Sequence, residues 1–349
     1  LLKKVFFLLD PELIHDFMTN VGKNLGSNKV SQFLTSIFFS FKHEKLIKTI
    51  DGIEFSNPVG LSAGFDYNGN LTQILPSVGF GFHTIGTVTY GKYEGNKKPR
   101  LGRFLKSKSL VVNKGLKSLG AKTIAAKLTG VKFSVPIGIS ISSTNKFYKT
   151  EKDQIVEIIK AFNIFEKSKV KHSYYELNIS CPNTFGGEPF SSPRKLKLLL
   201  STLEKLKVQK PIYIKMPIDQ SKIETLEMLK IIDKFSIAGV IFGNLTKDKS
   251  NPDIHPEDRK KWMNVKGNLS GKPTWKRSNE LIKLTKKHFK NRFTIIGTGG
   301  IFNGDDAIEK MKNGADLVQL ITGMIFEGPQ TIGEINLKLA QKALDKKAN

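Results

Sequence analysis

From about residue 50 onward, short apolar runs alternate with longer segments whose apolar residues recur at helical spacing. This alternation is typical of α/β proteins with a parallel sheet. The expected strands are 59–63, 80–87, 135–141, 174–179, 212–216, 239–242, 294–297 and 317–321. Helices are expected to begin near Leu71, Gly120, Glu151, Pro193, Lys222, Lys276, Gly304 and Gln330. Eight such units over roughly 300 residues predict a (β/α)8 TIM barrel, with a doubly wound open sheet as the alternative.

The first 45 residues follow a different pattern, in which two helical segments carry many large apolar residues. Asp10-Pro11-Glu12 supplies an N-cap, a proline at the first helical position and an early acidic residue. The apolar residues either pack on the main domain or expose an apolar face to a bilayer, with lysines toward the lipid headgroups. We therefore expect a helical N-terminal extension over residues 1–45 and a barrel domain over residues 46–349.

The amino-acid composition limits the classes of function that the chain can have. The chain is 39% hydrophobic and 25% charged, as globular proteins are. A net charge of +25 would suit nucleic-acid binding, but only six of the 56 basic residues are arginine, the residue favoured for bidentate recognition. We expect no nucleic-acid partner, although a basic surface favours anionic lipid headgroups. No apolar run reaches about 18 residues, so no membrane-spanning helix is expected.

Cys181 is the only cysteine in the 349 residues. A single cysteine excludes a disulfide framework and fits a reducing compartment. Because the chain contains no CxxC and no HExxH motif, no metal site is expected. A lone cysteine is more often an inert buried residue than a reactive one, so this residue type alone does not predict chemistry.

The position of Cys181 in the predicted barrel favours a chemical role for this residue. Chemistry in such barrels lies at the carboxyl ends of the strands, and Cys181 follows the fourth strand between Asn178 and Asn183. Lys215 interrupts the apolar fifth strand, where it requires an anionic partner. Glycine-rich turns follow strands seven and eight, where barrels commonly bind phosphate. These features predict a phosphate-bearing cofactor such as FMN above a small polar substrate.

Several motifs at matching spacing cover nearly the whole chain. They are residues 57–66, 85–89, 94–96, 99–100, 178–183, 268–271, 296–300 and 328–329, together with Lys215 and Gly323. On these motifs the chain resembles the dihydroorotate dehydrogenases, which are FMN-dependent barrel enzymes of pyrimidine synthesis. Residues 7–15 resemble the start of the membrane-associated, quinone-using class, whose helical extension admits the quinone to the flavin. The resemblance implies oxidation of dihydroorotate to orotate, with a quinone as electron acceptor and peripheral contact with lipid at the cytoplasmic side of a membrane.

The resemblance also implies roles for individual residues. Cys181 would be the base that takes a proton from C5 of dihydroorotate, for which a depressed pKa is useful. The substrate would be held by Tyr67, Asn113, Asn178, Asn183 and Asn244. FMN would be held by Ala63, Gly64, Thr87, Ser140, Asn178, Lys215, Gly243, Gly271, Gly299, Gly300, Thr322 and Gly323.

Some positions depart from the family pattern. The membrane class usually has serine where Cys181 stands, and the soluble class has cysteine. The family lysine after the Gly-Phe-Asp turn is Tyr67 here, a substrate-contacting threonine is Leu245, and a flavin-contacting asparagine is Ser140. Two alternatives therefore stay open: an FMN oxidoreductase for another dihydropyrimidine, and a flavin-binding protein without catalytic activity.

Overall fold

Eight parallel strands close into a barrel in the computed structural model, which describes residues 2–348. The order around the barrel is β10-β12-β13-β3-β4-β7-β8-β9. Their bounds are β3 (Val59–Leu61), β4 (Phe82–Thr89), β7 (Ile137–Ser142), β8 (Tyr174–Asn178), β9 (Ile212–Lys215), β10 (Gly239–Phe242), β12 (Thr294–Thr298) and β13 (Leu317–Leu320). The predicted TIM barrel is confirmed, and the open-sheet alternative is wrong because β9 at one end of this order pairs with β10 at the other.

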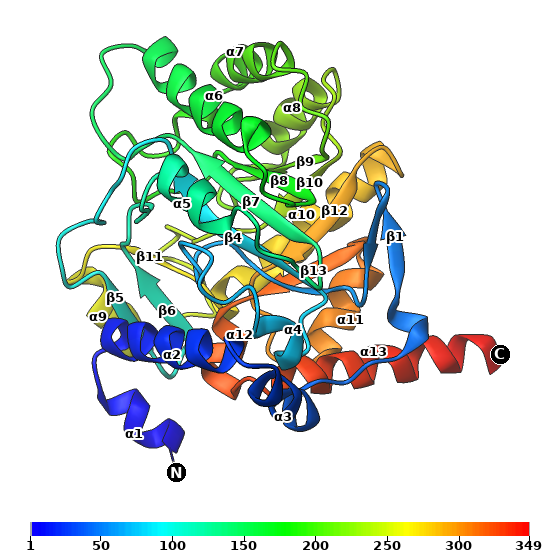
Figure 1. The fold of residues 1–349 in the computed structure, drawn as a ribbon. Helices are drawn as coiled ribbons and strands as arrows, with labels where there is room; N and C mark the ends of the chain where they lie inside the picture. Colours follow the sequence, from blue (N-terminus) through cyan, green and yellow to red (C-terminus); the bar gives the residue numbers. More distant parts are fainter. Residues whose placement is uncertain (1, 349) are drawn as a thin grey trace.

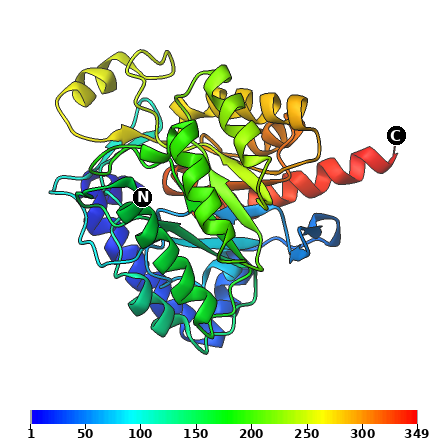
Figure 2. The ribbon, with the colours of Figure 1, turned by 90° about the horizontal axis from the view of Figure 1, so that it is seen from above.

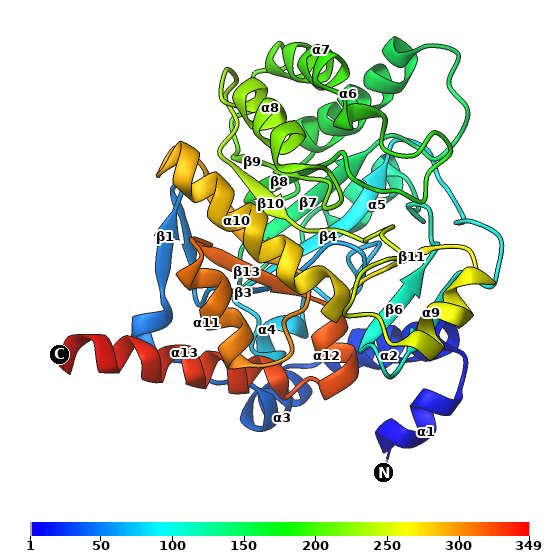
Figure 3. The same cartoon turned by 180° about the vertical axis from the view of Figure 1, so that it is seen from behind.

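Helices surround the barrel on its outside (Figures 1 and 3). They are α4 (Leu75–Val78), α5 (Ala121–Leu128), α6 (Glu151–Lys167), α7 (Pro193–Glu204), α8 (Lys222–Ile232), α10 (Trp275–Phe289), α11 (Gly304–Lys312), α12 (Thr322–Glu327) and α13 (Thr331–Ala348). Helix α6 shows how local sequence sets the start of a helix. Thr150 and Asp153 form a reciprocal capping box at its first turn. Its buried residues recur at helical spacing and face the strands.

The helix expected near Leu71 begins later, at Leu75. The intervening residues form a turn whose backbone is held by the buried carboxylate of Asp66, which accepts hydrogen bonds from the N–H groups of Asn70 and Leu71 at 2.8 Å each. A side chain that bonds the local backbone in this way competes with helix formation. The apolar pattern therefore starts one turn before the helix does.

A short antiparallel hairpin closes the amino-terminal end of the barrel. Strands β1 (Lys48–Ile50) and β2 (Ile53–Phe55) form it. Phe55 packs with Phe82, Tyr174 and Tyr213 in one fully buried cluster inside the barrel. Because this end is filled with aromatic side chains, a ligand can enter only from the opposite end.

Three further strands and two helices, α9 and α12, were not expected from the sequence. Strands β5 (Leu101–Phe104), β6 (Ser109–Val112) and β11 (Asn268–Leu269) form a small antiparallel sheet, and α9 (Pro256–Met263) lies beside it. Figure 2 shows this part standing out from the barrel. Its strands are two to four residues long, too short for a periodic apolar pattern.

The N-terminal extension consists of α1 (Leu2–Leu8), α2 (Pro11–Gly26) and α3 (Lys29–Phe39). Asp10 caps α2 as expected, since its carboxylate accepts hydrogen bonds from the N–H groups of Glu12 and Leu13. Helix α2 lies against β5, and α3 contacts α4 and α13 (Figure 1). Within residues 2–348 no helix combines the length and the apolar character needed to span a membrane.

Candidate active site

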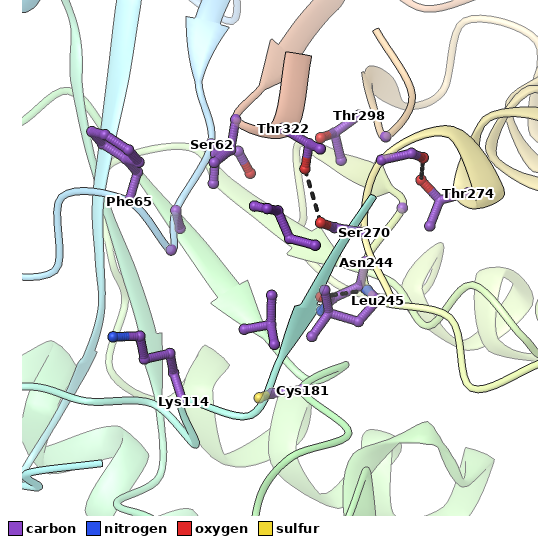
Figure 4. Close-up of a pocket in the computed structure, with 18 of the residues that line it drawn as sticks. Ser62, Phe65, Lys114, Cys181, Asn244, Leu245, Ser270, Thr274, Thr298 and Thr322 are labelled. Carbon is purple, nitrogen blue, oxygen red and sulfur yellow. Dashed lines mark hydrogen bonds between the residues drawn. The ribbon is translucent and has the colours of Figure 1, made fainter. Parts of the chain in front are cut away.

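A large cavity opens at the carboxyl ends of the barrel strands (Figure 4). It contains about 1180 Å³ of space free of atoms, part of which is continuous with solvent. Its lining combines glycines, apolar side chains and a few polar groups, as ligand pockets commonly do. Its wall includes residues from the barrel, from the small sheet and, through His15, from helix α2 of the extension.

Most of the residues predicted for the site line this cavity. They are Ala63, Gly64, Tyr67, Thr87, Asn178, Cys181, Asn183, Lys215, Gly243, Asn244, Gly271, Gly299, Gly300, Thr322 and Gly323. Two predicted residues, Asn113 and Ser140, do not line it. Ser140 is fully buried, and its hydroxyl is hydrogen-bonded to the Thr87 hydroxyl at 2.9 Å. Asn113 instead accepts a hydrogen bond from Asn96 Nδ2 at 2.9 Å, and Asn96 in turn donates to the carbonyl oxygen of the wall residue Asn183.

The three asparagines of the wall are each oriented by hydrogen bonds to the protein. Asn178 Nδ2 donates to Thr87 Oγ1 at 2.9 Å, and Asn183 Nδ2 donates to the Val112 carbonyl oxygen at 2.8 Å. Asn244 Nδ2 donates to the Ser180 carbonyl oxygen at 2.8 Å. An amide nitrogen carries two donors. Asn178 and Asn183 therefore each keep one N–H for a ligand. Asn244 gives both of its N–H groups to Ser180, and its oxygen accepts a hydrogen bond from the Leu245 N–H.

The thiol of Cys181 forms part of the same wall and is partly exposed (Figure 4). Burial raises its pKa to about 11, and the negative charge of Glu188 acts in the same direction. A hydrogen bond from the backbone at Asn183 and the positive charge of Lys215 lower this pKa, but only in part. The depressed pKa expected from the resemblance is thus wrong, because the desolvation of the thiolate outweighs the nearby cation.

Lys215 is buried at the inner end of the cavity. Its Nζ atom donates to the Ser62 hydroxyl at 3.1 Å. Burial lowers the pKa of Lys215, and the negative charge of Glu176 on the neighbouring strand opposes this shift. Within residues 2–348, no carboxylate comes within ion-pair distance of this Nζ. The direct anionic partner expected for Lys215 is therefore absent from the described protein, and its charge faces the cavity.

The glycine turns form a narrow part of the cavity wall. Gly299 and Gly300 adopt φ angles of +93° and +71°, which residues with side chains rarely adopt. A Cβ atom on Gly300 would lie 2.3 Å from the Cβ atom of Trp275. The backbone N–H groups of both glycines donate to no other group in the part of the chain that the structure describes. Two adjacent free donors on a closely packed turn fit an anionic oxygen of a ligand.

A buried ion cluster joins the N-terminal extension to this cavity, and the sequence did not reveal it. The Glu12 carboxylate contacts Arg100 at 2.8 Å and Lys114 Nζ at 2.6 Å. Burial alone would raise the pKa of Glu12, but hydrogen bonds and charges of the two cations lower it to about 2. Lys114 lines the cavity and lies 5.6 Å from the centre of the Tyr67 ring. The cluster therefore ties helix α2 to the cavity wall.

Asn96 was also not predicted as a site residue, although residues 94–96 were recognised as a motif. Its Nδ2 atom donates to Asn113 Oδ1 and to the Asn183 carbonyl oxygen, each at 2.9 Å. Its Oδ1 atom accepts from Tyr93 and Asn145. Asn96 thus links the loops that carry Asn113 and Asn183. Its spacing from those residues in the chain gives no sign of this role.

The barrel, its closed amino-terminal end and the polar cavity at its mouth define the protein as a TIM-barrel protein with an enzyme-like ligand site. Residues 45–343 match the family model described as dihydroorotate dehydrogenase. A dihydroorotate dehydrogenase (quinone) of Christiangramia forsetii is 36% identical over 349 residues, covering 99% of each chain. The corresponding protein of Buchnera aphidicola is 35% identical, covering 96% of this chain and 98% of its own.

The chain belongs to the dihydroorotate dehydrogenase family, and its resemblance to the quinone-dependent class is confirmed. The fold is also that of solved structures. The ligand-free DHODH of Eimeria tenella matches with a TM-score of 0.83 at 24% identity, covering 97% of this chain and 96% of that chain. The same enzyme in complex with ferulenol gives a TM-score of 0.82 at 23% identity, covering 97% and 92%.

Proposed function

We propose that this protein oxidises dihydroorotate to orotate, with FMN as the bound redox cofactor and a quinone as the final electron acceptor. The observation that carries the proposal is the position of Cys181 in the wall of a cavity that also contains the buried cation Lys215 and the glycine turn at Gly299 and Gly300. One ionisable proton acceptor, one inward-facing cation and one anion-binding turn are the groups that such a reaction requires.

The residues of the cavity fit FMN. The free N–H groups of Gly299 and Gly300 suit its phosphate, and Lys215 suits negative charge on the ring system. Ala63, Gly64, Thr87, Asn178, Gly243, Gly271, Thr322 and Gly323 would complete its contacts. When bound, FMN would supply the hydride acceptor for the reaction. Ser140 would act indirectly, by orienting the Thr87 hydroxyl.

The substrate would lie against Cys181 and the three oriented asparagines. Asn178, Asn183 and Asn244 would hold the polar edge of the pyrimidine ring, and Tyr67 would close one side of the site. Asn113 would act through Asn96, which bonds the Asn183 backbone. Cys181 Sγ would accept the C5 proton as a thiolate. Because its pKa is about 11, the thiolate forms more readily as the pH rises.

The N-terminal extension would give the quinone access to the site and hold the protein at a lipid surface. His15 of α2 reaches the cavity wall, so the extension and the ligand site are continuous. Several large apolar side chains of the extension are exposed: Val5, Leu8, Leu9, Leu13, Phe17, Met18, Leu25, Val30, Phe33, Leu34, Ile37 and Phe38. An exposed apolar surface of this extent supports peripheral membrane contact. In this proposal residues 1–45 are the access element and residues 46–349 are the catalytic domain.

Anaerobic addition of dihydroorotate to the purified flavin-loaded protein tests the proposal. We expect the flavin absorbance to bleach and a quinone analogue to restore it. Dihydrouracil, which lacks the carboxylate, serves as the matched comparison and should bleach the flavin far more slowly. Faster bleaching by dihydrouracil would favour another dihydropyrimidine substrate, for which Tyr67 and Leu245 in the cavity wall would be responsible. Bound flavin that neither compound bleaches would indicate a protein without this activity.

A further inference from the structure

Lys310 of α11 is completely buried, and the proposed reaction gives it no part. Burial lowers its pKa to about 7, and the negative charge of Asp306 on the same helix opposes this shift. Within residues 2–348, no carboxylate lies within ion-pair distance of its Nζ atom. A buried ammonium group is costly, whereas an apolar side chain of similar volume is not. The fold therefore has a use for the hydrogen-bond donors of Lys310.

The donors of Lys310 act on the first turns of helix α10. Its Nζ atom donates to the Ser278 hydroxyl oxygen at 3.0 Å and to Asn279 Oδ1 at 3.1 Å, and both acceptors belong to buried residues. A lysine ammonium group can only donate hydrogen bonds. The Ser278 oxygen therefore accepts from Lys310, and the hydrogen of its hydroxyl has to point elsewhere. Lys310 thus sets the direction of the Ser278 hydroxyl.

The hydrogen of this hydroxyl is shared between two backbone carbonyl groups at the carboxyl ends of neighbouring barrel strands. The acceptors are the carbonyl oxygens of Phe242 in β10, at 3.0 Å, and of Thr298 in β12, at 2.8 Å. The Thr298 oxygen also accepts a hydrogen bond from the Gly243 N–H at 3.1 Å. Two donors from two different elements therefore hold the Thr298 carbonyl in one orientation.

The Thr298 carbonyl belongs to the peptide group that also carries the Gly299 N–H. This peptide bond is trans, so its C=O and N–H groups point in opposite directions. A carbonyl held toward Ser278 therefore turns the Gly299 N–H away from α10 and toward the ligand cavity, which Gly299 lines. Among the described residues this N–H has no acceptor, so it is available to an anionic oxygen.

We propose that Lys310 and Ser278 are positioning residues for the phosphate group of FMN. Lys310 directs the Ser278 hydroxyl, the hydroxyl holds the Thr298 carbonyl, and this carbonyl orients the Gly299 N–H. The inference rests on the proposed function, in which the phosphate lies against the turn at Gly299 and Gly300. Lys310 and Ser278 do not line the cavity themselves, so their effect on the cofactor is confined to recognition of its phosphate.

Competition between FMN and riboflavin tests this network, because riboflavin lacks only the phosphate. The flavin-loaded full-length protein is dialysed to equilibrium against mixtures of the two flavins, and chromatography of the bound flavin gives the preference for FMN. Ser278→Ala should lower this preference about tenfold, since the Thr298 carbonyl loses one of its two donors. Lys310→Met should lower it about threefold, because the hydroxyl remains but its direction is no longer set. The double variant should match Ser278→Ala alone, since Lys310 acts through Ser278.

Thr285→Val is the matched control for these variants. Thr285 is buried in the same helix, and its hydroxyl donates to the Leu281 carbonyl oxygen at 2.8 Å, away from the glycine turn. This variant should keep the wild-type preference even if it unfolds more readily, because both flavins bind the same folded protein.

The possible outcomes separate this network from the proposed function. An equal fall of the preference in Thr285→Val would overturn the network, since general loosening would then explain the result. A wild-type preference in Lys310→Met would also overturn it, and this variant decides alone if Ser278→Ala does not fold. Equal binding of FMN and riboflavin by the wild type would remove the phosphate site itself. A wild-type protein that binds no flavin would instead overturn the proposed function.

Discussion

The inside of the barrel and the N-terminal helices both carry large apolar side chains, and the two regions use them differently. Phe82, Tyr174 and Tyr213 are completely buried in the barrel. In the extension, Leu8 is 87% exposed and Phe38 is 75% exposed. Burial of such side chains stabilises a fold by about 1.5–3 kcal/mol each, so the extension forgoes most of this contribution. Apolar content alone therefore does not identify a core.

The polar groups of the two regions show the reverse contrast. Inside the barrel mouth, Asn178, Asn183 and Asn244 are each fixed by hydrogen bonds. In the extension, Glu12 is buried against Arg100 at the barrel mouth, and His15 Nε2 is hydrogen-bonded to the Phe65 carbonyl oxygen at 2.9 Å. A site that aligns a substrate needs rigid polar groups, whereas a surface that contacts lipid needs outward-facing apolar ones. The molecule separates these needs between its two regions and joins them at Glu12.

The largest effect is expected in the barrel mouth. Cys181→Ala should lower the rate of flavin bleaching by dihydroorotate by about 10²–10⁴-fold, because it removes the proposed base. Flavin binding and vesicle binding should remain as in the wild type. In the wild-type protein the rate should rise with pH up to about 11, since the thiolate is the active form and burial raises its pKa to about 11. Loss of bound flavin in the variant would instead assign Cys181 a structural role.

The next effect is expected where the two regions meet. Glu12→Gln leaves Arg100 and Lys114 buried without their carboxylate and should lower the free energy of unfolding by about 3 kcal/mol, measured by denaturant titration. The folded pKa of Glu12 lies near 2, below its ordinary value of 4.5. Its contribution is therefore complete above pH 4.5 and is lost as the pH falls toward 2. The variant should lack this acid-dependent part of the stability.

Glu257→Gln is the matched control for Glu12→Gln. Glu257 forms an ion pair with Lys106 in which both side chains are largely exposed. Solvent screens exposed pairs of this kind, so the control should unfold almost as the wild type does. Equal losses in the two variants would show that Glu12 does not anchor the extension more firmly than a surface pair would.

The comparison also shows what could be predicted from the sequence. The barrel was predictable because each strand buries an apolar run, and barrel geometry then placed Asn178, Cys181 and Lys215 at one end. The other predicted ligand contacts came from the family resemblance. The cluster of Glu12, Arg100 and Lys114 could not be predicted. Glu12 and Arg100 are 88 positions apart, and neither lies in a periodic pattern. The direction of the Cys181 pKa shift was wrong because it depends on burial in three dimensions, which spacing does not encode.

The smallest effect on folding stability is expected in the extension. The same substitution tests the proposal that the extension binds a membrane. Phe38→Ser should change the free energy of unfolding by no more than about 0.5 kcal/mol, since its side chain is 75% exposed. Binding to vesicles of phosphatidylcholine and phosphatidylglycerol should weaken by about tenfold, because insertion of a phenylalanine side chain contributes about 1.5–3 kcal/mol. Co-sedimentation at several lipid concentrations measures this loss.

Phe147→Ser provides the comparison for this last variant. Phe147 is 68% exposed, but it lies on a barrel loop, where it contacts Phe185. If the exposed apolar face of α1 to α3 is the membrane surface, Phe147→Ser should bind vesicles as the wild type does. Equal weakening by both substitutions would mean that any exposed aromatic residue on this basic protein promotes lipid binding. The extension would then be distinguished from the barrel by its exposure alone and not by a function.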